Sequence, residues 1–449
     1  MKKSIISILL TIIMATTLLM GCGGSDDKKT DGKVTITVPD RILNKISTSP
    51  YTEKLQKEFD ELYGDEIEVV HVLPYVSSDL NDTRGLTAIL MGNDAPAYIN
   101  VSNAYNAKSL YNMGLTADIS KYVKDNEEFK SLRQAAVDAF TYSDGAVIGY
   151  PTQIELSLLG FYNESLQAAG YNPETFDCNT WDEYYSAVEK MSAGDAKGSS
   201  LFVGEFLLWP QNWLLSNEAE VAIQNEDGTI SLNFADKKVV ETIEFMRKLY
   251  QNGHTNTNIS ATDADSMFSA MYSGDIASFT MYPQWIDRFV SQGIYPEDIT
   301  LKTFPAGPSG KQQQAVHTAG VVFNSQLSEK ELEAAVKYVT FVYGADAMNG
   351  MMEYSKDNSI TDVTISASEK VDWTANLSDF PQQWIDTVNE ALEIGVDASL
   401  DSNGYFTYIC AKLPEIIEGT GDIATEMQKA QDLATNEWLN DYNNTRKKK

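Results

Sequence analysis

The amino-acid sequence predicts an α/β fold built as two domains. Short apolar segments at residues 34–38, 67–73 and 97–101 alternate with helical segments, one of them around residues 80–91. These repeated β-α steps indicate a mainly parallel sheet with helices on both faces. The chain of 449 residues is too long for one ordinary hydrophobic core, and its 43% hydrophobic content is that of a globular protein. We therefore expect about two α/β domains.

The first long helix is predicted to begin at Pro50. Proline suits the first helical position, where its missing N–H costs nothing. Leu55, Phe59 and Leu62 follow at a spacing that puts them on one helical face, and Gly64 is the expected end of the helix.

Two later helices carry a capping box at their start. Thr180 is followed three residues later by Glu183, and Ser328 by Glu331. In this arrangement the hydroxyl and the carboxylate each accept a hydrogen bond from a backbone N–H group that the helix leaves unpaired. A further helix is expected over residues 236–252, where apolar side chains recur at helical spacing.

The N-terminus predicts export and lipid attachment. Lys2 and Lys3 precede an apolar stretch over residues 5–20, which is the layout of a secretory signal peptide. The following sequence LMGC, ending at Cys22, resembles the lipobox of bacterial lipoproteins, in which the cysteine thiol carries diacylglycerol. We therefore expect residues 1–21 to be removed as a signal peptide.

The lipidated cysteine and a flexible Gly-, Ser-, Asp- and Lys-rich tether would occupy residues 22–32. More than one acyl chain gives stable anchoring, so the protein is expected on the outer face of the cell membrane. A plain secreted protein with an incidental cysteine is the alternative. No second long apolar run is present, so we expect the rest of the chain to lie outside the membrane.

Charge and cysteine content narrow the possible partners. The net charge is −30, and a surface this acidic repels phosphate backbones, so nucleic acid is not an expected partner. The mature chain keeps two cysteines, Cys178 and Cys410. They could form a disulfide, but a secreted protein of this size does not need one, and we expect two buried, unpaired thiols.

Several short segments from residue 94 onward follow one another in a recognisable order. The most specific is NTWDE at residues 179–183, which is similar to a "pkTWdEl" signature. DAPAYI at residues 94–99 is similar to an "aPDv" stretch, although Ala97 replaces the usual acid. Further matching segments lie at residues 145–151, 159–163, 168–170, 267–279, 304–310, 319–323 and 418–426. Together they resemble the family 1 extracellular solute-binding proteins, the sugar-binding receptors of bacterial ABC importers.

This resemblance implies an α/β, periplasmic-binding-protein-like fold of type II. Two lobes are joined by a multi-strand hinge, and the ligand is held in the cleft between them. Opening and closing of such lobes converts binding into a shape that a permease can read. The expected division is residues 33–149 with 281–327 for the first lobe, residues 150–280 with 328–445 for the second lobe, and residues 150–151, 279–281 and 325–328 for the hinge crossings.

Candidate ligand-binding residues are those that flank the predicted strands and hinge crossings, because ligands of open α/β sheets sit beyond the carboxyl ends of strands. Sugars need flat aromatic rings together with carboxylates and amides. Two tryptophans are added because they lie in a polar-flanked, Pro-interrupted segment, whereas Trp181, at the start of a capped helix, is expected to be structural. Each aromatic candidate is also compatible with a packed core position. The candidates are Asp40, Asn103, Tyr105, Glu155, Trp209, Trp213, Tyr282, Trp285 and His317.

The sequence gives little support for an enzymatic function. It contains no G-x-S-x-G, H-E-x-x-H, G-x-x-x-x-G-K-[ST] or G-x-G-x-x-G motif. The only histidines, His71, His254 and His317, are far apart, so we expect neither a histidine-built metal centre nor a Ser-His-Asp triad. A glycosidase needs only two carboxylates, but no pair among the 64 acids is marked. We expect a non-enzyme without cofactor or metal.

The predicted function is therefore that of a solute receptor. A monomer, anchored through lipid on Cys22, would capture a mono- or oligosaccharide and deliver it to the permease subunits of an ABC transporter. Phosphorylated sugars are disfavoured because no cluster of Arg or Lys lies near the candidate loops. The alternatives are a receptor for a peptide or a polyamine, and a surface glycan adhesin or hydrolase.

Overall fold

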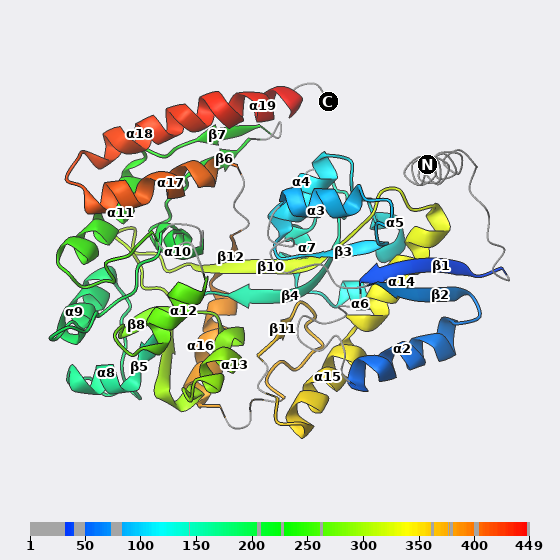
Figure 1. Ribbon diagram of the computed structural model, residues 1–449, viewed down its shortest axis with the longest axis horizontal. Coiled ribbons are helices and arrows are strands. Elements are labelled where there is room, and N and C mark those ends of the chain that lie inside the picture. Colours follow the sequence, from blue (N-terminus) through cyan, green and yellow to red (C-terminus); the bar gives the residue numbers. More distant parts are fainter. Residues whose placement is uncertain are drawn as a thin grey trace, which may run out of the picture.

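The protein consists of two lobes joined by strands that cross between them (Figure 1). The predicted signal peptide and Cys22 lie outside the described residues. Within those residues, none of the helices has both the length and the apolar character needed to cross a membrane. The computed structural model describes residues 32–39, 50–72, 83–142, 144–203, 208–225, 229–260, 264–360, 363–375, 377, 380–398 and 404–446.

The first lobe is built on short strands covered by helices. Strands β1 and β2 pair in parallel, with Val34 opposite Ile67, as the β-α-β pattern predicts. Phe59 is fully buried between them and the helices, and its ring lies 4.9 Å from that of Tyr338. The elements are β1 (Val34–Pro39), α2 (Pro50–Tyr63), β2 (Ile67–Val72), α3 (Thr83–Leu90), β3 (Tyr98–Val101), α4 (Ala104–Asn112), α5 (Ser120–Val123), α6 (Glu127–Lys130), α7 (Gln134–Ala139), α14 (Glu329–Val342) and α15 (Ala345–Asp357).

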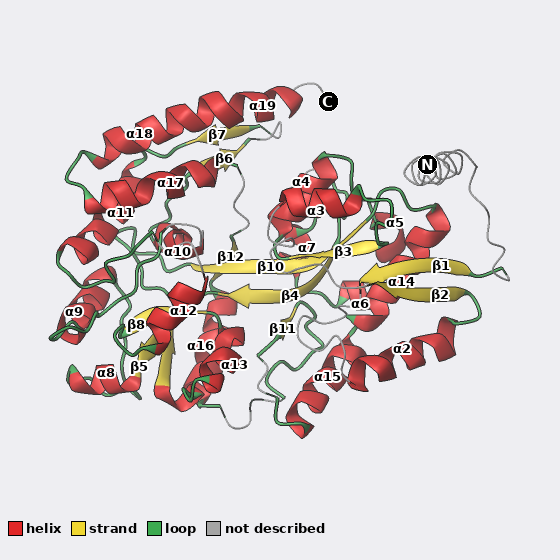
Figure 2. Ribbon diagram, in the orientation of Figure 1, coloured by secondary structure: helices red, strands yellow, loops and turns green. Residues whose placement is uncertain are grey.

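The second lobe contains a three-stranded antiparallel sheet and most of the helices, which lie outside the strands (Figure 2). Its sheet has the order β8-β5-β9. The elements are β5 (Leu158–Tyr162), α8 (Asn163–Ala168), α9 (Trp181–Met191), α10 (Leu208–Ser216), β6 (Ala222–Gln224), β7 (Ile230–Leu232), α11 (Lys237–Gln251), α12 (Ala264–Tyr272), β8 (Ser278–Met281), a 3-10 turn (Pro283–Trp285), α13 (Ile286–Ser291), a second 3-10 turn (Pro296–Asp298), β9 (Ile299–Lys302), α16 (Gln382–Glu393), β12 (Gly395–Asp397), α17 (Tyr405–Glu418), α18 (Ile423–Ala434), a π-helical turn (Thr435–Leu439) and α19 (Asn440–Arg446).

The predicted helix starts are confirmed. Thr180 and Ser328 each form a complete capping box, at the N-termini of α9 and α14. Asp236 caps α11, and its carboxylate accepts a hydrogen bond from the backbone N–H of Lys238. Leu62 is an exception on α2, because it is 64% exposed although Leu55 is buried.

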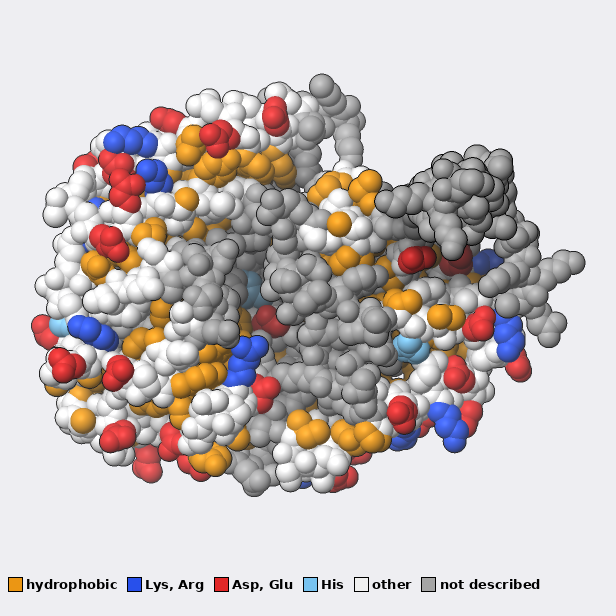
Figure 3. Space-filling model, in the orientation of Figure 1, with side chains coloured by type: hydrophobic (Ala, Val, Ile, Leu, Met, Phe, Trp, Pro, Cys, Tyr) orange, Lys and Arg blue, Asp and Glu red, His pale blue; other side chains and the backbone are white. Residues whose placement is uncertain are grey.

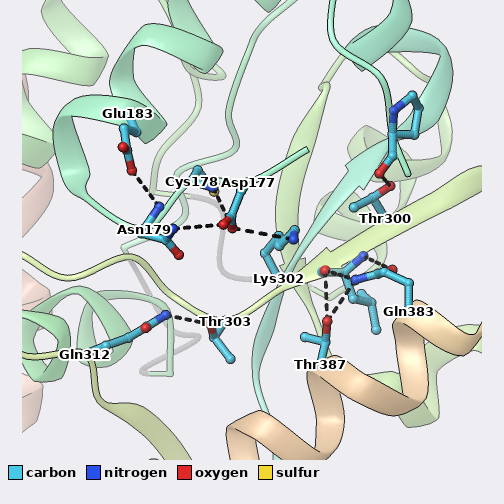
Figure 4. A network of polar contacts seen from close by, with 12 residues as sticks. Asp177, Cys178, Asn179, Glu183, Thr300, Lys302, Thr303, Gln312, Gln383 and Thr387 are labelled. Carbon is cyan, nitrogen blue, oxygen red and sulfur yellow. Dashed lines mark hydrogen bonds and ion pairs between the residues drawn. The ribbon is translucent and has the colours of Figure 1, made fainter. Parts of the chain in front are cut away.

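Polar side chains hold β9 between its neighbours in the second lobe. The Lys302 ammonium lies 3.5 Å from the Asp177 carboxylate, which also accepts a hydrogen bond from the side chain of Asn179 (Figure 4). On the other side, the amide of Gln383 bonds the backbone of Leu301 in both directions. These contacts fix β9 to the start of α9 and to α16.

Three strands cross between the lobes side by side. They are β4 (Tyr150–Leu156), β10 (Gln314–Phe323) and β11 (Ile365–Ser366), in the order β11-β4-β10. Each strand contributes one end to the core of each lobe. Tyr150, Val321 and the adjacent Ala367 pack in the first lobe, and Ile154, Val316 and Ile365 pack in the second.

The hinge contains an irregularity where β4 meets β10. The register shifts between Ala319 and Gly320, and Gly320 lies opposite Pro151. Proline has no N–H to donate, and inside a sheet it is accommodated where the hydrogen-bond ladder is interrupted. A Cβ atom on Gly320 would lie 2.5 Å from the Phe140 ring and 2.6 Å from the carbonyl oxygen of Tyr150, so a larger residue does not fit without movement.

The strand crossings correct the expected lobe boundaries. Helices α14 and α15 pack in the first lobe, because β10 carries the chain back into that lobe before they begin. Helix α13 and strand β9 belong to the core of the second lobe. The expected hinge crossing at residues 279–281 is instead the end of β8 inside that core, and the crossing expected at residues 325–328 occurs earlier, within β10. Strand β3 is antiparallel to β10, not part of a parallel sheet.

At the C-terminus a side chain closes the edge of a hairpin. Strands β6 and β7 pair antiparallel, and the N–H of Ile230 donates to Oδ1 of Asn443 at 2.8 Å. The Nδ2 of Asn443 donates back to the carbonyl oxygen of Ile230 at 2.9 Å. The amide of Asn443 therefore occupies the position of a neighbouring strand. In the π-helical turn before α19, Trp438 stacks on Tyr442 with ring centroids 4.7 Å apart.

Candidate functional site

Polar side chains lie on the hinge strands between the two lobes. Gln153 and Glu155 are two residues apart on β4, so they share a face of the sheet, and Nε2 of Gln153 donates to Oε1 of Glu155 at 2.7 Å. His317 on β10 is the register partner of Glu155, which places both side chains on this face. Gln153 and Glu155 are half-buried, and His317 is 3% exposed. The hinge thus presents a carboxylate, an amide and an imidazole together.

An aromatic pair follows β8 on the second lobe. The rings of Tyr282 and Trp285 have centroids 4.5 Å apart and are tilted by 39°. Phe268 of α12 also contacts Trp285 in a T-shaped arrangement, with ring centroids 5.0 Å apart. Burial raises the pKa of Tyr282 well above its ordinary value, and the nearby Glu155 carboxylate raises it further, so the phenol stays protonated. Met281 pairs with Leu158, so Tyr282 leaves β8 beside Ser157, two residues after Glu155 of the hinge.

Two hydroxyl side chains next to Tyr282, those of Ser278 and Thr280, were not among the candidates predicted from the sequence. Ser278, Thr280 and Tyr282 alternate with Phe279 and Met281 in and after β8, which is the period-2 signal that puts three hydroxyls on one side. Ser278 uses its hydroxyl to bond the carbonyl of Gly198. In the part of the chain that the structure describes, the hydroxyl of Thr280 is buried without a hydrogen-bond partner. Such groups carry a free-energy cost unless a ligand or water satisfies them.

The first-lobe candidates lie at the start of α4. Val101, at the end of β3, pairs with Gly320 of the hinge, so the chain that follows leaves the sheet beside β10. Asn103 uses its side-chain oxygen to cap α4, accepting from the N–H of Asn106 at 2.9 Å. Tyr105 is half-buried on the first turn of this helix. Both residues approach the hinge from the first lobe, and Asn103 already has a structural role.

Trp213 lies in the core of the second lobe, away from solvent. It is 2% exposed, and the rings of Tyr184, Phe245 and Phe304 surround it at centroid distances of 5.0, 5.3 and 5.0 Å. Since aromatic side chains of the protein surround its ring, Trp213 is a core residue and not a candidate ligand contact. Trp181, expected to be structural, packs in the same cluster.

The side chains of two candidates lie outside the part of the protein that the structure describes. Asp40 is not among the described residues, and the side chain of Trp209 is not described, although its backbone lies in α10. Of the nine candidates, the structure therefore brings together Glu155, His317, Tyr282 and Trp285.

The chemistry of this site is that of non-covalent binding. Aromatic rings offer flat apolar surface, and the carboxylate, amide and hydroxyl groups offer hydrogen bonds in several directions. In the described residues, no three His, Cys, Asp or Glu side chains are grouped so that they could hold a metal ion. Acidic and basic side chains are interspersed around the rim of both lobes on the viewed face (Figure 3). Cys178 and Cys410 are free and buried, in agreement with the expectation of unpaired thiols.

Comparisons with known proteins agree with this architecture. The chain is 20% identical over 367 residues to an arabinooligosaccharide-binding protein of Bacillus subtilis, with 78% of each chain covered. An ABC substrate-binding protein of Listeria monocytogenes, solved in complex with cycloalternan, superposes with a TM-score of 0.68 at 18% identity, covering 90% of this chain and 98% of that one. A sugar transporter of Arthrobacter chlorophenolicus with bound laminaribiose gives a TM-score of 0.67 at 15% identity, covering 90% and 99%.

These likenesses show the fold, a type II periplasmic-binding-protein-like arrangement of two lobes. The family model of the bacterial extracellular solute-binding proteins matches residues 54–378, which is well over half of the 449 residues. The chain belongs to the family of bacterial extracellular solute-binding proteins.

Proposed function

We propose that the protein captures a carbohydrate, a mono- or oligosaccharide, between its two lobes and delivers it to the permease of an ABC transporter. One observation carries this proposal: the Tyr282–Trp285 pair follows β8 where Met281 pairs with Leu158, three residues after Glu155 of the hinge, and Glu155 has Gln153 and His317 as neighbours. A sugar ring has an apolar C–H face and a rim of hydroxyls. Aromatic rings match the face, and carboxylates and amides match the rim.

The names of relatives support the same ligand class. The Bacillus subtilis relative is an arabinooligosaccharide-binding protein, and the two solved structures hold cycloalternan and laminaribiose. A second relative in that organism, 21% identical over 282 residues and covered over 52% of its length, is a polygalacturonan/rhamnogalacturonan-binding protein. Neutral and acidic oligosaccharides therefore both belong in a ligand screen.

The site supports binding and not turnover. Hydrolysis of a glycosidic bond needs two carboxyl groups flanking the scissile bond, whereas the neighbours of Glu155 on the hinge include the amide of Gln153 and, across the strands, His317. We propose that the protein is not an enzyme, that Cys22 carries the lipid, and that the protein works on the outer face of the membrane as a monomer.

The test is a thermal-shift screen of residues 23–449, followed by calorimetric titration. The panel contains arabinotriose, laminaribiose, maltose, digalacturonic acid, peptides and polyamines. We expect one sugar to raise the melting temperature in a saturable way. At a hundredfold excess of this sugar over its dissociation constant, the stabilisation should be about 2.7 kcal/mol. A response to peptides or polyamines alone would reject the carbohydrate ligand. Release of sugar products on incubation would reject the non-enzymatic role.

Two substitutions connect the screen to the site. Trp285→Ala and Glu155→Gln should each weaken binding by about 1–3 kcal/mol, because one removes the ring face and the other a charged hydrogen-bond acceptor. Met91→Ala is a matched surface control, since Met91 is 70% exposed at the end of α3. Unchanged affinity in both site variants would move the ligand elsewhere in the protein.

A further inference from the structure

Three buried polar side chains meet where α10 touches the hinge strands. Asn212 of α10 donates through Nδ2 to the hydroxyl of Ser157, which lies between β4 and β5. Gln314, at the start of β10, donates through Nε2 to the carbonyl oxygen of Ser157 and, at 3.2 Å, to Oδ1 of Asn212. The Oε1 of Gln314 accepts from the N–H of Phe304 at 3.2 Å. All three side chains are completely buried, with 0% of their surface exposed.

The elements joined by this network are those that carry the candidate ligand residues. Ser157 follows Glu155 by two residues, and Gln314 precedes His317 by three residues on the same strand. Met281 pairs with Leu158 in antiparallel register, so Ser157 and Tyr282, the next residues along the two strands, are neighbours. The network thus ties α10 to the two hinge strands that carry Glu155 and His317.

A second bond fixes the same end of the helix. Gln211, 2% exposed, donates its amide N–H to the carbonyl oxygen of Ala398, which follows β12. Strand β12 itself pairs in parallel with the first residues of β10, from Gln314 opposite Gly395. The N-terminal half of α10 is therefore held to β10 both directly and through β12.

Buried amides are an unusual way to hold a helix for stability alone. Apolar side chains of similar volume would pack here without the desolvation that each amide incurs, and paired polar groups exchanged for apolar ones can leave stability nearly unchanged. What hydrogen bonds add is a unique geometry, because donors and acceptors must meet at set distances and angles, whereas apolar surfaces tolerate sliding.

We propose that Asn212 and Gln314 are positioning residues for ligand binding: they hold the hinge strands in one register against α10, so that Glu155 of β4 and His317 of β10 are aligned. This inference rests on the proposed function. Neither side chain is exposed to a ligand, since both are completely buried. Their loss leaves the lobes folded but the binding residues misaligned.

The test separates alignment from stability. Asn212→Leu leaves the Ser157 hydroxyl buried without its donor, and it should lower both the stability and the affinity for sugar. In Asn212→Leu/Ser157→Ala no orphaned hydroxyl remains, so stability should recover toward that of the unmodified protein. The affinity of the double variant for sugar should stay about tenfold or more below that of the unmodified protein, because the hydrogen bond between α10 and the hinge is still missing. Gln314→Leu should weaken binding similarly.

A matched control is available in the same lobe. Gln383 is an amide that bonds the backbone of Leu301 and the hydroxyl of Thr387, and so joins β9 to α16 and not to α10 (Figure 4). Gln383→Leu removes a comparable network and should lower stability without changing affinity.

The measurements are urea unfolding and calorimetric titration with arabinotriose, laminaribiose and maltose. The inference holds if the double variant regains stability and stays weak in binding. It is overturned if affinity returns with stability, because the network is then only structural, or if Gln383→Leu weakens binding as strongly. If the unmodified protein binds none of the three sugars, the proposed function fails and this inference falls with it. If the unmodified protein binds and all variants bind equally, this inference alone fails.

Discussion

Trp213 provides a direct test of the difference between a buried aromatic core and a ligand platform. Its side chain is 2% exposed and meets three aromatic rings within 5.3 Å. An aromatic side chain of this kind buries about 150–250 Å². At about 25 cal/mol per Å² this corresponds to about 4–6 kcal/mol of transfer free energy, part of which an alanine retains. Trp213→Ala should therefore lower the free energy of unfolding by about 3–5 kcal/mol, the range of such core truncations.

The assay is urea unfolding of residues 23–449, followed by far-ultraviolet circular dichroism. Trp438→Ala is the control, because Trp438 is only half-buried at the surface of the same lobe and should cost clearly less. Sugar affinity of the Trp213 variant should remain close to that of the unmodified protein under conditions in which it is folded. A loss below about 1 kcal/mol, or a selective loss of affinity, would refute the assignment of Trp213 to the core.

Three further outcomes follow from described contacts. Gly320→Val should destabilise the protein by about 1–3 kcal/mol in urea unfolding, because its Cβ would lie 2.5 Å from the Phe140 ring; unchanged stability would mean that the hinge bulge is not tightly packed. Burial lowers the pKa of His254, so below about pH 6.5 the unfolded chain binds a proton that the folded chain does not. As the pH is lowered, the free energy of unfolding should therefore decrease, and it should decrease less in His254→Asn than in the unmodified protein. Equal slopes in the two proteins would contradict that assignment. Burial also raises the pKa of Cys178 to about 12 and that of Cys410 further, so maleimide should label neither thiol in the folded protein and both after unfolding.

Local signals in the sequence predicted local structure well. The capping boxes at Thr180 and Ser328 place the first turns of α9 and α14 where the structure has them. The reason is that a cap needs only residues within one turn of each other. The parallel pairing of β1 and β2 was also predictable, since one helix connects them.

The assignment of helices to lobes could not be predicted in the same way. Whether α14 covers the first or the second lobe depends on how far β10 runs before it ends, and β10 pairs with β3 and β4, which are more than 150 residues away in sequence. Such pairings leave no mark in the local pattern. The same holds for strand direction in β3.

Core and site aromatics were hard to separate for a related reason. Trp213 has Gln211 and Asn212 as sequence neighbours, and polar neighbours suggested a loop near solvent. In the structure both amides are buried and fully engaged, so they belong to the interior together with the tryptophan. Glu155 and His317 are register partners across the hinge, a relation that only the folded sheet reveals.

The clamp between Asn443 and Ile230 has a consequence for self-association. A two-stranded hairpin offers open edges, and an open edge is a template on which another chain can add a strand. A side-chain amide has the donor and acceptor of one peptide group, so Asn443 fills the edge at Ile230 without bringing a third strand. The last helix thus covers the hydrogen-bonding groups of this edge at Ile230, and an added strand would have to displace Asn443 to pair there.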